Sequence, residues 1–153
     1  MKPPPDSAGR LSMDKKTYPN ALLLGEVAAV LDEGREAIIL PTGNSMLPFI
    51  RGGVDRVVLH RTPEVAVGDI ALVYAEGRYL LHRIVAREGD ALTLMGDGNV
   101  RGLEHCRRAD VIGTVAEIIR PDGSRRKPGK ASLWQALRPV RRYLLAFYKR
   151  VLI

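Results

Sequence analysis

Residues 42–50 have the sequence Thr-Gly-Asn-Ser-Met-Leu-Pro-Phe-Ile, a small polar loop that runs into an apolar segment. Gly43 can adopt backbone conformations that are closed to residues with a Cβ. Pro48 fixes its own φ and favours an extended Leu47. Together they predict a bent, poorly flexible loop around Ser45, which suits a nucleophile. A Gly-x-Ser sequence by itself has a simpler interpretation, a turn with a solvated serine.

The composition fits one globular domain. The chain has 153 residues, of which 46% are hydrophobic and 27% charged, enough to bury a sizeable core. Its formal net charge is +7, and much of the positive charge follows residue 124. A basic protein favours acidic partners such as nucleic acid or anionic lipid. The uneven distribution predicts a basic C-terminal segment rather than a basic groove.

The cysteine and histidine content excludes two kinds of site. Cys106 is the only cysteine, so the chain has no internal disulfide. One cysteine and three scattered histidines offer no metal-ligand spacing, and we expect neither a metal nor another cofactor. His105 and Cys106 are adjacent, but neighbours on an extended segment point to opposite faces and do not form a thiol dyad.

The N-terminal residues do not resemble a targeting segment. Residues 1–16 carry three consecutive prolines followed by polar and charged residues, and we expect a disordered tail. The tail lacks the apolar stretch of a signal peptide. Nowhere do about 18 uncharged apolar residues run together, as a transmembrane helix requires. These features predict a cytoplasmic protein, with peripheral attachment to a membrane as an open alternative.

Short apolar runs predict a mainly β domain over residues 17–125. Asn20 is placed to cap a helix over residues 21–33, which ends at Gly34. Residues 75–78 predict a hairpin turn. Apolar runs separated by turn signals predict strands at 37–40, 56–60, 69–74, 78–86, 91–95 and 111–119. Many short strands of this kind are typical of a strongly coiled sheet or a barrel.

Residues 126–153 comprise a basic linker and a predicted amphipathic helix. Ser132 is placed to cap this helix, and Pro139 should kink or restart it. Apolar residues recur at spacings of three and four between Leu133 and Val151, beside aromatic and basic residues. Residues 131–153 can therefore pack back on the β domain or lie on an anionic membrane surface, and both interpretations stay open.

A serine hydroxyl needs a base to remove its proton. Every lysine lies outside residues 17–126 and arginine does not release its proton, so we expect a histidine base. His82 is the best candidate, because Leu80, His82 and Ile84 would share one face of a buried strand. Burial disfavours the imidazolium and keeps His82 able to accept a proton. A core histidine bonded to the backbone is the alternative interpretation.

A catalytic base is commonly oriented by a carboxylate on its other ring nitrogen. Asp97 follows His82 by one hairpin and is the candidate for this role, although it can equally cap its own turn. An oxyanion hole would use the Ser45 N–H and a second donor. Asn44 and Thr42 are both candidates for that donor.

Five sequence blocks occur in order along the chain. They are Gly-Asn-Ser-Met-Leu-Pro at 43–48, Val-Gly-Asp-Ile at 67–70, Leu-His-Arg-Ile at 81–84, Gly-Asp-Gly-Asn at 96–99 and Asp-Val-Ile-Gly at 110–113. In this order they resemble the signal peptidase I / LexA-like serine peptidase superfamily, over roughly residues 40–119. The His-Arg-Ile element is similar to the archaeal and endoplasmic-reticulum branch, which uses histidine where bacterial leader peptidases use lysine.

This resemblance implies a β-rich fold of the signal peptidase/LexA type, with Ser45 as nucleophile and His82 as base. Asp97 matches the Gly-Asp-Asn block of the family, and Gly43, Met46 and Pro48 would be structural residues around the site. The chain departs from the pattern at several points, among them Gly-Gly-Val-Asp at 52–55, where a Gly-Asp pair is usual. Gly43 stands where a hydroxyl residue is common, and the further acid of the endoplasmic-reticulum branch has no clear counterpart in residues 101–104.

These observations favour a serine endopeptidase that cleaves a peptide or protein substrate. An extended substrate could pair with an exposed sheet edge. The alternative is a catalytically inactive module on the same fold that binds a peptide or a membrane surface. Aromatic residues make up only 5% of the chain, and the basic residues gather on a terminal helix, which counts against nucleic-acid binding.

Overall fold

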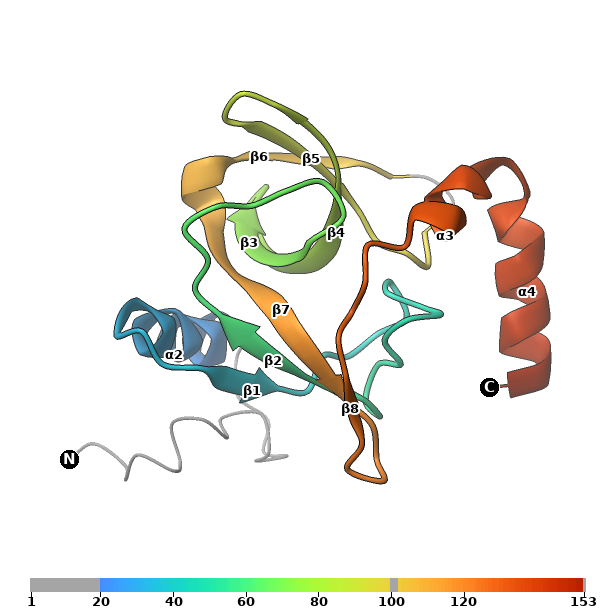
Figure 1. Ribbon diagram of the computed structural model, residues 1–153, viewed down its shortest axis with the longest axis horizontal. Helices are drawn as coiled ribbons and strands as arrows, with labels where there is room; N and C mark the ends of the chain where they lie inside the picture. The colour runs from blue at the N-terminus through green and yellow to red at the C-terminus, as the bar shows by residue number, and fades with distance from the viewer. Residues whose placement is uncertain (1–19, 100–101, 153) are drawn as a thin grey trace.

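A computed structural model describes residues 20–99 and 102–152 (Figure 1). Its strands form one antiparallel sheet of eight that curls into a half-barrel, with short helices before and after it in the sequence. The prediction of a mainly β fold is therefore confirmed. The predicted disordered tail at residues 1–16 lies outside the described residues.

The elements follow the chain in a simple order. They are α2 (Asn20–Asp32), β1 (Ala37–Ile39), β2 (Arg56–His60), β3 (Ile70–Ala75), β4 (Arg78–Glu88), β5 (Ala91–Met95), β6 (Glu104–Arg107), the 3₁₀ helix η2 (Arg108–Asp110), β7 (Val111–Ile119), β8 (Arg125–Arg126), α3 (Ser132–Ala136), the 3₁₀ helix η3 (Arg138–Val140) and α4 (Arg141–Leu152). Across the sheet the strands are ordered β1-β2-β7-β3-β4-β5-β6, and β8 pairs with β7. Every strand predicted from an apolar run is present, whereas β6 and β8 were not predicted.

Strand β4 occupies a central position in the sheet. It follows β3 through a tight hairpin in which Glu76 and Gly77 both have positive φ, 54° and 78°, as a two-residue type I′ turn requires. On its other side β4 pairs with β5. His82 lies opposite Ala71 of β3 and is only 6% exposed. The prediction of a central, buried strand around His82 is confirmed.

Two apolar clusters hold the sheet in its curled form. In the first, Val27, Val30 and Leu31 of α2 pack against residues of β1, β2, β3 and β7. In the second, residues of β3 to β6 pack together, Leu80 and Ile84 of β4 among them. Each fully buried Val, Leu or Ile side chain stabilises the fold by about 1.5–3 kcal/mol. Strand β4 is therefore held firmly where it carries His82.

Pro139 divides the C-terminal segment into α3, η3 and α4, so the helix restarts as predicted. The Trp134 indole Nε1 donates to the Asp97 carbonyl at 2.9 Å. The Arg141 Nη2 donates to the Gly96 carbonyl at 3.1 Å. These contacts fasten the segment to the turn that follows β5. Within the described residues, no helix is long and apolar enough to cross a membrane.

Candidate active site

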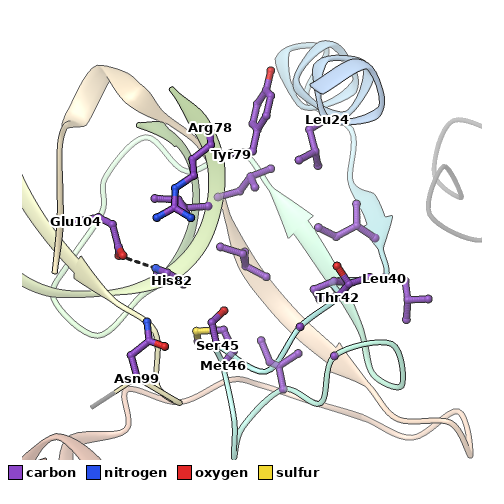
Figure 2. Close-up of a pocket in the computed structure, with 18 residues that line it drawn as sticks. Leu24, Leu40, Thr42, Ser45, Met46, Arg78, Tyr79, His82, Asn99 and Glu104 are labelled. Atoms are coloured by element: carbon purple, nitrogen blue, oxygen red, sulfur yellow. Dashed lines mark hydrogen bonds and ion pairs between the residues drawn. The ribbon is translucent and has the colours of Figure 1, made fainter. Parts of the chain in front are cut away.

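A cavity of about 420 Å³ opens between the 42–50 loop and the first half of β4. Ser45 lines it from the loop side, and His82 lines it from β4 (Figure 2). Glu104 of β6 and Asn99 also line it. The remaining wall is largely apolar, formed by residues such as Leu24, Ile39, Ile50, Leu72 and Leu81. The fold thus brings Ser45 and His82 to one cavity, and none of the lysines that the structure describes lines it.

The His82 imidazole is fixed by Glu104. Its Nδ1 lies 2.6 Å from the Glu104 Oε1, and both side chains are more than nine-tenths buried. A carboxylate only accepts hydrogen bonds, so we assign the ring proton to Nδ1. The other nitrogen, Nε2, then keeps its lone pair and can accept a proton. This arrangement prepares His82 to act as a base.

Ser45 and His82 face the same space without a direct hydrogen bond. Figure 2 shows the Ser45 side chain on the loop below His82, with its oxygen directed into the cavity. Among the described residues, the Ser45 hydroxyl makes no hydrogen bond. In an active site without substrate, the hydrogen bond between a nucleophile and its base is often long, and it shortens when a substrate binds.

Asp97 does not take the position predicted for it. Its carboxylate is bound by the Arg83 guanidinium, with Nε at 2.8 Å and Nη2 at 2.7 Å, and both side chains are fully buried. His82 and Arg83 are neighbours on β4 and therefore point to opposite faces of the sheet. The prediction that Asp97 orients His82 is wrong for this reason, and Glu104 makes that contact.

The Arg83–Asp97 pair instead supports the Ser45 loop. It holds the turn at residues 96–99, in which the Gly98 N–H donates to the Ser45 carbonyl at 2.7 Å. A Cβ on Gly98 would lie 2.3 Å from the Asn44 carbonyl oxygen, and a Cβ on Gly96 would lie 2.3 Å from the Ser45 carbonyl oxygen. The turn therefore packs backbone against backbone on the loop, which explains why it contains glycine at both positions.

The loop is also closed on its other side. Gly43 has a φ of +81°, as its predicted role in a bent loop requires. A Cβ on Gly52 would lie only 1.7 Å from the Gly43 carbonyl oxygen, and the Gly53 N–H donates to the Pro41 carbonyl at 2.7 Å. The Leu47–Pro48 bond is cis. Ser45 is held between these backbone contacts and the 96–99 turn.

Buried Asp55 anchors the end of this loop. It accepts from the Arg51 backbone N–H at 2.8 Å and from the Arg51 Nη2 at 3.0 Å, and it pairs with Arg120 of the segment after β7. Burial alone would raise the pKa of Asp55, but the Arg51 hydrogen bonds and the Arg120 charge outweigh it and lower that pKa. The resulting stabilisation is present at neutral pH and is lost as the pH falls through the lowered pKa.

The candidates for the oxyanion hole differ in position. Thr42 lines the cavity, whereas Asn44 is exposed and is not among the lining residues. The Ser45 N–H has no acceptor among the described residues and is available to an oxyanion. Asn99 lines the cavity and brings a side-chain amide that the sequence analysis did not consider as a donor (Figure 2). Buried Met46 completes the floor beside Ser45.

The other histidines and the cysteine lie elsewhere. His60 and His105 do not line the cavity. On β6 the exposed and buried sides alternate, so His105 is exposed and Cys106 is buried, as predicted. Burial, with a smaller contribution from the Asp110 charge, raises the pKa of the Cys106 thiol to about 11. In residues 20–99 and 102–152, no group of histidine, cysteine or acidic side chains could hold a metal ion.

Glu104 is the site residue that the sequence analysis missed. It lies in the segment where no counterpart to the family's further acid was recognised. Strand β6 has the sequence Glu-His-Cys-Arg, with too few apolar residues to predict a strand. Its burial depends on pairing with β5, in which Leu94 lies opposite Glu104. The available signal for a strand here would have been an alternation of buried and exposed positions that begins at Glu104.

Comparison with known proteins identifies no family. A scan against protein-family models gave no match, and a search of curated proteins found no similar sequence.

The geometry predicts a distinct effect for Glu104→Gln. The uncharged amide holds the His82 Nδ1–H less firmly than a carboxylate, so fluorophosphonate labelling of Ser45 should slow by on the order of 10- to 1,000-fold. Labelling rates measured by intact-protein mass spectrometry test this expectation. Glu117→Gln removes a carboxylate that pairs with Arg125 on the surface and should leave the rate unchanged. A Glu104→Gln variant that is labelled at the wild-type rate would contradict the assignment.

Proposed function

We propose that this chain is a serine endopeptidase of the signal peptidase I / LexA-like superfamily, with the corresponding type of coiled β fold. One observation carries the proposal. Ser45 and His82 line a single cavity, and the buried Glu104 carboxylate lies 2.6 Å from the Nδ1 of the His82 ring, which leaves Nε2 as the candidate base. Nucleophile, base and orienting acid in this relation are what serine acylation needs.

The residues suggest a two-step reaction. His82 Nε2 takes the proton of the Ser45 hydroxyl while Oγ attacks the carbonyl carbon of the scissile peptide bond. The attack leaves a negative charge on the former carbonyl oxygen, and the Ser45 N–H stabilises this oxyanion with Thr42 or Asn99 as a second donor. The C–N bond then breaks, and His82 gives its proton to the leaving amine. A water molecule, deprotonated by His82, hydrolyses the Ser45 ester and restores the hydroxyl.

The position of the cavity favours a peptide substrate. Strand β1 is at one end of the strand order, and residues 39–43 leading from it into the Ser45 loop all line the cavity. An extended peptide lying beside this segment would present a carbonyl to Ser45 and a side chain to the apolar wall. Arg78 and Glu104 are the charged side chains among the described residues that line the cavity, so an uncharged apolar side chain fits best at that point.

Fluorophosphonate labelling tests the proposal without a known substrate, because only an activated serine reacts. The intact protein should gain one phosphonyl group, and tryptic mapping should place it in the peptide of residues 36–51, whose only serine is Ser45. Ser45→Ala should not be labelled there and should not cleave a peptide library. An unlabelled wild-type protein, or labelling at Ser132 instead, would favour the alternative of an inactive module that binds peptide or membrane.

A further inference from the structure

Helix α4 carries an apolar face that the β domain does not cover. Four large apolar side chains of this helix are at least 40% exposed, with Tyr143 and Phe147 above 60%. The four are Tyr143, Leu144, Phe147 and Val151. They recur at spacings of three and four and therefore lie along one side of the helix, here termed the outer face. A contiguous exposed apolar patch of this kind marks an interaction site.

The other side of the helix is already anchored. Arg141 and Leu145 are 1% and 3% exposed. Arg141 donates to the Gly96 carbonyl and lies over the Trp134 ring at 5.3 Å, and Trp134 meets Phe49 edge-on at 6.2 Å. The packing of this side agrees with the interpretation that the segment lies against the β domain. One face packs on the domain and the outer face stays open, at the edge of the molecule (Figure 1).

The charged residues in and around α4 are all basic. Arg142 and Arg150 are exposed. The Arg142 guanidinium lies over the Tyr143 ring at 4.8 Å and its Nη2 donates to the Tyr143 hydroxyl at 2.8 Å, and helical spacing places Arg150 beside Tyr143 on the outer face. After Asp122 the sequence contains no acidic residue up to Ile153. Two copies of this helix facing each other would bring like charges together, which counts against a second copy as the occupant. An anionic surface would complement the charge instead.

We propose that the outer face of α4 binds the surface of an anionic lipid bilayer. Its apolar side chains would enter the boundary between headgroups and acyl chains, and Arg142 and Arg150 would meet the lipid phosphates. With 12 residues α4 is too short to span a bilayer and would lie parallel to it. This binding is independent of any chemistry at Ser45. Trp134 would keep its contact with the 96–99 turn throughout.

Vesicle sedimentation with the full chain tests this proposal. The wild-type protein should pellet with phosphatidylglycerol-containing vesicles, much less with pure phosphatidylcholine, and less as salt rises. Tyr143→Asp combined with Phe147→Asp should reduce the bound fraction at least about tenfold, since two charges would enter the apolar boundary. Arg142→Glu combined with Arg150→Glu should reduce it similarly, and only at low salt.

Matched variants separate this proposal from a general effect of charge. Val67→Asp places an acid at another exposed apolar position, and Arg61→Glu with Arg107→Glu repeats the charge reversal elsewhere on the surface. The apolar control should bind as the wild type does, and the charge control should bind more tightly than the α4 reversal. A wild type that ignores anionic vesicles at low salt would overturn the proposal. So would a Tyr143→Asp/Phe147→Asp protein that binds vesicles normally but changes from dimer to monomer in sedimentation velocity.

Discussion

The His82→Ala variant is expected to lose about 10³-fold or more in the rate of fluorophosphonate labelling at Ser45. The methyl group cannot take the Ser45 proton, and no lysine of the described residues lines the cavity to substitute for the base. Labelling rates measured on wild type and variant side by side check this expectation.

His105→Ala is the matched control for this experiment. His105 is exposed on β6 and lies outside the cavity, so its removal should leave the labelling rate within about twofold of wild type. The thermal unfolding of both variants should be recorded first, because His82 is buried. A folded His82→Ala protein that reacts as fast as wild type would exclude His82 as the base.

The Asp97→Ala variant is expected to lose about 3–5 kcal/mol in the free energy of unfolding. The substitution leaves the fully buried Arg83 guanidinium without its ionic partner, and an uncompensated buried charge is among the most destabilising changes known. Domains of this size are stable by about 5–15 kcal/mol in total, so the variant would keep only part of its stability. Urea unfolding followed by circular dichroism measures the difference.

Two further variants sharpen this second experiment. Asp97→Asn keeps an oxygen that can accept from Arg83 and should lose less stability than Asp97→Ala. Asp32→Ala removes an exposed carboxylate that lies 3.6 Å from Arg61 and should change the unfolding free energy by about 0.5 kcal/mol or less. Equal stability of Asp97→Ala and wild type, combined with lost labelling at Ser45, would return Asp97 to a direct part in catalysis.

Much of the fold could be predicted from periodicity, because its strands are apolar runs bounded by turn residues. The runs at 56–60, 91–95 and 111–119 match β2, β5 and β7 residue for residue. Strand β6 could not be found this way, since half of its four side chains face solvent and one of the buried pair is a glutamate. Its place in the sheet comes from long-range pairing with β5, which a local pattern does not report.

For the candidate site, too, the residues with a local sequence signal could be predicted, and the contact that depends on long-range pairing could not. Ser45 and His82 each have a local signal, a constrained loop and a buried strand. The partner of His82 depends instead on which face of β4 an acid reaches, and positions 82 and 83 differ by one residue. Sequence distance favoured Asp97, but the fold gives Asp97 to Arg83 and brings Glu104 to His82 from the opposite side. Choosing between the two acids requires the long-range pairing of β6 with β5, which places Glu104.

The turn at residues 96–99 receives hydrogen bonds from Trp134 and Arg141, which follow it by 37 and 45 positions. During synthesis on a ribosome the turn is therefore made well before the residues that hold its carbonyls. Until α3 and α4 have been made and have docked, the Gly96 and Asp97 carbonyls lack these donors. The backbone support of Ser45, through the Gly98 N–H, is then incomplete. The nascent chain consequently completes the support of the Ser45 loop only after the β domain itself has left the ribosome.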